Sequence, residues 1–74
     1  MKRFINALQE NGYTPNSHGD AYDRGLNRVF FTDSNIIFIE YNNPEAQLVV
    51  NDARISMNMS VERAMKIIKA LEVK

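Results

Sequence analysis

The chain has 74 residues, nine basic and nine acidic, and is 45% apolar, which is typical of one small globular domain and excludes a disordered segment. It has no cysteine, which excludes a disulfide framework and a thiolate metal site. Its longest uninterrupted apolar run, residues 36–39, is far too short to span a membrane, and the first ten residues lack a continuous signal-peptide core. We therefore expect a cytoplasmic protein with no membrane association.

The charges are unevenly distributed although they sum to zero. Residues 1–3 and 54–74 carry seven cations against two anions, whereas residues 10–52 carry seven anions against two cations. A separation of this kind can orient a charged partner. The alternative is that the two groups of charges simply keep different surfaces solvated.

The first ten residues predict an amphipathic helix. Its apolar residues recur at helical spacing: Met1, Phe4, Ile5 and Leu8. Gly12 suits the left-handed position just past a helix end, and Tyr13 can then fold back onto the apolar stripe.

Residues 14–26 show no clear periodicity and contain Pro15, Gly19 and Gly25. We expect a loop of about a dozen residues here, with room for a short strand at 13–15 or 21–22. A loop of this length in a small domain is a place to look for function.

Residues 28–59 predict a four-stranded antiparallel meander with strands at 28–32, 36–41, 46–51 and 54–59. A loop at 33–35 would place Phe30 opposite Phe38, and a tight turn at 51–53 would separate the last two strands. Alternation then assigns one face to the core: Val29, Phe31, Ile37, Ile39, Tyr41, Leu48, Val50, Ile55, Met57 and Met59. The other face is mostly polar but holds an apolar island.

Ser60 predicts the N-cap of a second helix, with Glu62 in its positive first turn. Its apolar stripe comprises Val61, Ala64, Met65, Ile67, Ile68 and Leu71. The predicted fold is an α+β two-layer sandwich: an N-terminal helix, a long loop, a four-stranded antiparallel β-meander and a C-terminal helix. Both helices would cover the apolar face and leave the other to solvent or a partner.

No motif indicates catalysis, a metal or a cofactor. His18 is the only histidine, and its spacing to Asp20 and Asp23 matches no standard zinc or calcium site. The chain has no nucleophile motif, no P-loop and no dinucleotide-type glycine pattern. We expect a protein that is not an enzyme.

The apolar island is the main candidate for a protein-binding site, because an aromatic centre with a polar rim has the anatomy of an interface. The predicted contact residues are Phe30, Ile36, Phe38 and Val49 at the centre and Arg28, Glu40 and Arg54 at the rim. Secondary contacts are predicted from the loop, at Asp20, Asp23 and Arg24. Two alternatives remain: the 15–26 loop could cover the island, or the two helices could lie on opposite faces.

The favoured hypothesis is a small non-catalytic module, an adaptor or inhibitor of a larger protein, of the kind that phages and mobile elements encode. Pairing of two copies through the same face, or through edge strands, is compatible with it. The alternative is a nucleic-acid-binding regulator that uses Arg63, Lys66 and Lys69 of the second helix. Zero net charge and a pI near 6.6 weigh against that alternative.

Overall fold

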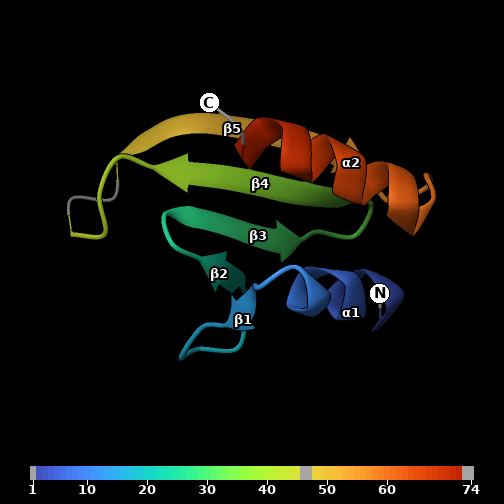
Figure 1. Ribbon diagram of the computed structural model, residues 1–74, viewed down its shortest axis with the longest axis horizontal. Helices are drawn as coiled ribbons and strands as arrows, with labels where there is room; N and C mark the ends of the chain where they lie inside the picture. The colour runs from blue at the N-terminus through green and yellow to red at the C-terminus, as the bar shows by residue number, and fades with distance from the viewer. Residues whose placement is uncertain (1, 46–47, 73–74) are drawn as a thin grey trace.

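The computed structural model describes residues 2–45 and 48–72, so Met1 of the predicted helical stripe lies outside the described residues. Within them, helix α1 (Lys2–Glu10) precedes an antiparallel sheet and helix α2 (Val61–Glu72) follows it (Figure 1). The strands, in chain and spatial order, are β1 (Thr14–Pro15), β2 (Tyr22–Arg24), β3 (Asn27–Phe31), β4 (Asn35–Tyr41) and β5 (Val49–Ser56). The predicted α+β class is confirmed, with five strands in place of four.

The end of α1 and the start of α2 lie where the sequence predicts. At the end of α1, the Tyr13 N–H donates to the Leu8 carbonyl at 3.0 Å and the Gly12 N–H donates to the Gln9 carbonyl at 3.1 Å. This is a Schellman motif, and Gly12 supplies the positive φ of 92° that it needs. At the start of α2, Ser60 Oγ accepts from the Arg63 N–H at 3.2 Å, which confirms the predicted N-cap.

The predicted loop at 14–26 contains two short strands. β1 pairs with β2, and β2 pairs with β3, so this segment extends the sheet. Its tip is closed by Asn16, whose side chain donates to Asp20 Oδ1 at 2.8 Å and accepts from the Asp20 N–H at 3.1 Å. The sequence left room for a short strand at 13–15 or 21–22, and a strand forms at both places. Strands of two and three residues are too short to show a period, so the sequence could not establish them.

The turn between β3 and β4 is one residue shorter than predicted. The Thr32 N–H donates to the Asn35 carbonyl at 2.9 Å, and the Thr32 hydroxyl accepts from the Asn35 N–H at 3.1 Å. Only residues 33 and 34 lie between these two, so Val29 pairs with Phe38, and Phe30 pairs with Ile37. A one-residue slip turns a whole strand over.

The predicted faces of β4 are therefore wrong. Ile36, Phe38 and Glu40 were expected on the outer face, and they are buried at 1%, 0% and 7% exposure. The residues that alternate with them, expected in the core, are only partly buried and lie on the opposite face: Ile37, Ile39 and Tyr41.

The predicted turn at 51–53 is also wrong. Residues 49–56 form the single strand β5, which pairs with β4 so that Ile36 lies opposite Ile55 and Phe38 opposite Ala53. A register shift at Glu40/Tyr41 places Tyr41 opposite Val49. Phe38 and Val49, which the sequence grouped at the centre of one face, are therefore not neighbours.

Both helices pack on one face of the sheet. They start at the same end of the molecule and run in the same direction, roughly along the strands (Figure 1). The core cluster joins residues of both helices to three strands and to the α1–β1 junction: Ala7, Leu8, Tyr13, Val29, Ile36, Ile55, Ala64, Met65 and Ile68. The alternative of helices on opposite faces is thus wrong. In the described part of the chain, neither helix is long and apolar enough to cross a membrane.

The register predicts unequal costs for two adjacent isoleucines of β4. Ile36→Ala should lower the free energy of unfolding by about 2–5 kcal/mol, because it leaves a cavity between the sheet and the helices. Ile37→Ala should cost less than about 2 kcal/mol, because the side chain is only partly buried and solvent can fill its place. Urea denaturation of both variants measures the difference, and a larger cost at Ile37 would show that the faces are reversed.

Candidate functional site

The side of the sheet that faces away from the helices carries an apolar strip at the centre of β3 and β4. We call this side the open face, and its residues are Arg28, Phe30, Ile37, Ile39, Tyr41, Val49, Asp52 and Arg54. Phe30 lies opposite Ile37, and Arg28 lies opposite Ile39. All four are partly exposed, because neither α1 nor α2 packs on this side. β4 is therefore apolar on both of its faces.

Two shallow hollows indent the open face and share Ile39. One, of about 160 Å³, is lined by Ile37, Ile39, Asp52, Ala53 and Arg54. The other, of about 480 Å³, is lined by Asp20, Ala21, Arg28, Phe30, Ile39 and Tyr41. The two hollows together form a trough centred on Ile39, with Asp20 and Ala21 of the β1–β2 loop as one wall. The loop thus borders the apolar strip and leaves it partly exposed.

Arg28 is held in place at the rim of the trough. Its Nε lies 2.7 Å from Asp23 Oδ1, and its second contact joins a terminal nitrogen to Asp23 Oδ2 at 3.1 Å. The guanidinium carbon also lies 5.6 Å from the centre of the Tyr41 ring, within cation–π range. The hydrogen bonds with Asp23 raise the pKa of Arg28 above its ordinary value. A side chain fixed by two partners loses little further entropy on binding.

The predicted contact residues divide between the two faces. Arg28, Phe30, Val49 and Arg54 lie on the open face, as predicted. Ile36, Phe38 and Glu40 lie on the helix side instead and cannot meet a partner while the protein is folded. Their places are taken by residues that the sequence assigned to the core: Ile37, Ile39 and Tyr41. The signal that would have found them is the Thr32–Asn35 pair, which closes a two-residue turn.

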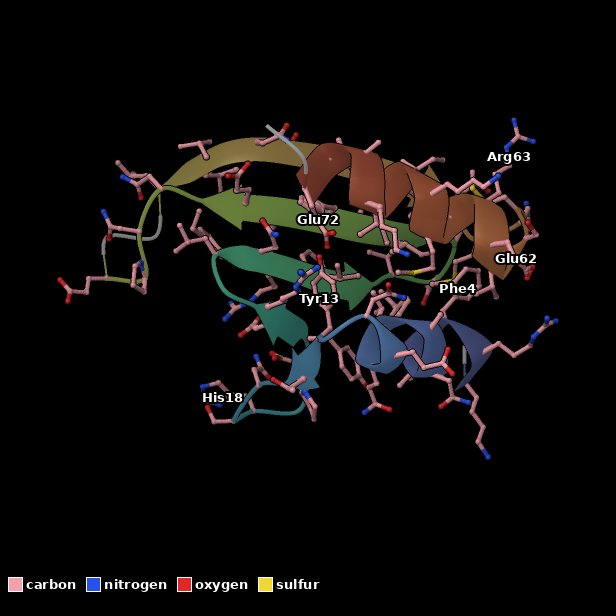
Figure 2. The ribbon with its side chains drawn as sticks, viewed as in Figure 1. Phe4, Tyr13, His18, Glu62, Arg63 and Glu72 are labelled. Carbon is pink, nitrogen blue, oxygen red and sulfur yellow. The ribbon has the colours of Figure 1, made fainter. Side chains whose placement is uncertain are left out.

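The predicted loop contacts also separate. Asp20 lines the larger hollow and Asp23 holds Arg28, so both border the open face. Arg24 lies near α2, where it contacts Glu72 Oε1 at 3.2 Å. His18 is exposed at the tip of the β1–β2 loop (Figure 2), and the described residues contain no cluster of three metal-ligating side chains.

The predicted basic residues of α2 are exposed: Arg63, Lys66 and Lys69. None of the three forms an ion pair within residues 2–45 and 48–72. Arg54 lies on the open face, on the other side of the sheet from α2, so it does not extend this basic surface. Lys2 and Arg3 are exposed on the first turn of α1, which starts at the same end of the molecule as α2 (Figure 1).

A buried polar contact that the sequence did not indicate ties the end of α2 to the first hairpin. The Tyr13 hydroxyl donates to Glu72, and the two side chains point toward each other in Figure 2. Burial raises the pKa of Tyr13 above its ordinary value of 10.0, and the hydrogen bond to Glu72 raises it further. Arg24 completes the group through its ion pair with Glu72. The contact lies on the helix side and holds the two layers together.

The raised pKa of Tyr13 predicts a loss of stability at alkaline pH. The unfolded chain releases this proton near the ordinary value of 10.0, whereas the folded protein retains it. Tyr13 therefore contributes fully to stability below that pH. Above it, the free energy of unfolding falls by about 1.4 kcal/mol per pH unit. Urea denaturation of wild type and Tyr13→Phe at about pH 8 and about pH 11 isolates the effect. Equal pH dependence in both proteins would contradict it.

Comparisons of the chain with protein-family models, with curated proteins and with solved structures gave no match.

Proposed function

We propose that this protein is a non-catalytic protein-binding module, an adaptor or inhibitor of a larger protein, and that it binds through the open face. The observation that carries the proposal is the apolar strip of Phe30, Ile37, Ile39 and Tyr41, which neither helix covers. Contiguous apolar surface that remains accessible on a small protein is typical of a contact surface.

The chemistry of the rim favours a protein as the partner. Arg28 is already paired with Asp23, and the other edge of the trough carries Asp52 and Arg54, which have opposite charges. The face therefore has no excess of positive charge with which to follow a phosphate backbone. An apolar centre with a rim of both signs suits a protein surface that has an apolar protrusion and a mixed polar border.

Ile39→Asp tests the proposal because Ile39 is shared by both hollows. The variant should keep native circular dichroism, since the side chain is outside the core, and should weaken partner binding at least about tenfold, because it places a charge at the centre of the contact. Proteins captured from nuclease-treated lysate of the source cell would be identified by mass spectrometry, and their affinity then measured by isothermal titration calorimetry.

Lys66→Asp is the matched control, because it introduces the same side chain on the exposed face of α2. It should bind the captured protein as wild type does. A partner that binds Ile39→Asp and wild type equally would contradict the proposal.

A second candidate function is nucleic-acid binding by α2, and the observation that favours it is the exposure of Arg63, Lys66 and Lys69 on one helix. If these three neutralise phosphates, log affinity should fall with log salt with a slope of roughly −2 to −3. Fluorescence anisotropy with labelled single- and double-stranded oligonucleotides measures it. Lys66→Glu combined with Lys69→Glu should abolish binding while Ile39→Asp leaves it unchanged. Salt-independent binding, or no binding, removes this candidate.

A further inference from the structure

The two edges of the sheet are built differently. The β1 edge has two residues, one of them Pro15, so it offers little backbone to another strand. The β5 edge has eight residues and contains neither proline nor lysine, two residues that commonly protect edges. Within the described residues, β5 pairs only with β4 (Figure 1). The long edge is therefore available to a further strand.

The backbone hydrogen bonds of β4 determine which backbone groups of β5 point outward. Toward β3, the Asn35 carbonyl accepts from Thr32 and the Tyr41 N–H donates to Leu26. Because backbone direction alternates along a strand, the even-numbered residues of β4 point toward β5. The Met57 N–H accordingly donates to the Ser34 carbonyl at 3.2 Å. Odd-numbered residues of β5 are thus directed at β4.

It follows that the N–H and C=O groups of Asp52 and Arg54 point away from the sheet. The side chains of the same two residues are exposed on the open face. Neither forms an ion pair within residues 2–45 and 48–72. The bulge opposite Tyr41 lies at the Val49 end of β5, so residues 51–56 pair regularly with β4.

Opposite charges two residues apart on such an edge are self-complementary. In an antiparallel pairing with a second copy centred on Ala53, Asp52 lies opposite Arg54 of the second copy, and Arg54 lies opposite its Asp52. Both are outward-directed residues, so each pair also exchanges two N–H···O bonds. Directly opposed charges of opposite sign stabilise a sheet, and like charges destabilise it.

Two neighbouring registers also pair outward-directed residues with each other, but they place like charges opposite each other. Centring the pair on Asp52 opposes two aspartates, and centring it on Arg54 opposes two arginines. The register centred on Ala53 pairs as much of β5 as the one centred on Asp52, and more than the one centred on Arg54. It places the exposed Val49 and Val50, at 50% and 56% exposure, beside residues 56–57 of the second copy.

We propose that the β5 edge binds a second copy of this chain, antiparallel and centred on Ala53, to form a two-fold symmetric dimer with one continuous sheet. This goes beyond the proposed function and does not rest on it. The symmetry keeps both sets of helices on one side of the sheet. The two open faces then join into one surface across the Asp52–Arg54 pairs.

Two charge reversals test the register. Asp52→Arg opposes two arginines at both contacts, and Arg54→Asp opposes two aspartates. Each variant alone should dimerise at least about tenfold more weakly than wild type, because two attractive pairs become repulsive. Mixed together, the variants restore both opposite-charge pairs, so the heterodimer should form with near wild-type affinity. Sedimentation equilibrium from micromolar to millimolar concentration, and native mass spectrometry of the mixture, measure this.

Glu10→Arg, a reversal on α1 away from the edge, is the control and should dimerise as wild type does. Circular dichroism establishes that each variant is folded. Amide exchange gives an independent readout: the outward N–H groups of Asp52 and Arg54 should become protected with rising concentration, while those of Ala53 and Ile55 are protected throughout. A wild-type monomer at millimolar concentration would overturn the proposal. So would single variants that dimerise normally, or a mixture that forms no heterodimer.

Discussion

The two-residue turn between β3 and β4 is the constraint on which the rest of the structure depends. The Thr32 backbone and hydroxyl bond Asn35, and this pairing sets which side of β4 faces the helices. With this register, Ile36 and Phe38 complete the core together with Val29. A turn with one more residue would exchange these side chains for Ile37 and Ile39, and with them the core and the exposed surface.

The sequence predicted both helices and the α+β class because caps and helical periodicity are local signals. It could not decide which alternating side chains of β4 face the core, because residues 36–39 are apolar at every position and show no alternation. The Asn51-Asp52 pair reads as a turn, yet in the folded chain it continues a strand, in which Asn51 lies opposite Glu40 and Asp52 opposite Ile39 of β4. The sequence therefore predicted an outer sheet face with an apolar centre, but three of the seven residues it placed there are buried on the helix side: Ile36, Phe38 and Glu40.

Both proposed surfaces follow from the two-layer arrangement of the described residues. Two helices cover one side of the sheet, and the described residues contain no third layer to cover the other. The open face then offers apolar side chains, and β5 offers backbone groups and paired charges. Side-chain packing would select a partner on the face, whereas main-chain hydrogen bonds would join copies at the edge. The two surfaces meet at Asp52 and Arg54, which lie at the border of the open face and on the β5 edge, and both can act in the same molecule.

The register itself is tested most directly by nuclear Overhauser contacts between α-protons in an isotope-labelled sample. Pairs of an antiparallel sheet that do not exchange hydrogen bonds bring their Cα atoms to about 4.5 Å, so their α-protons are in close contact. The structure predicts such contacts between Val29 and Phe38 and between Ile39 and Asp52. A contact between the α-protons of Phe30 and Phe38, or of Val29 and Ile39, would contradict the register and with it both surfaces.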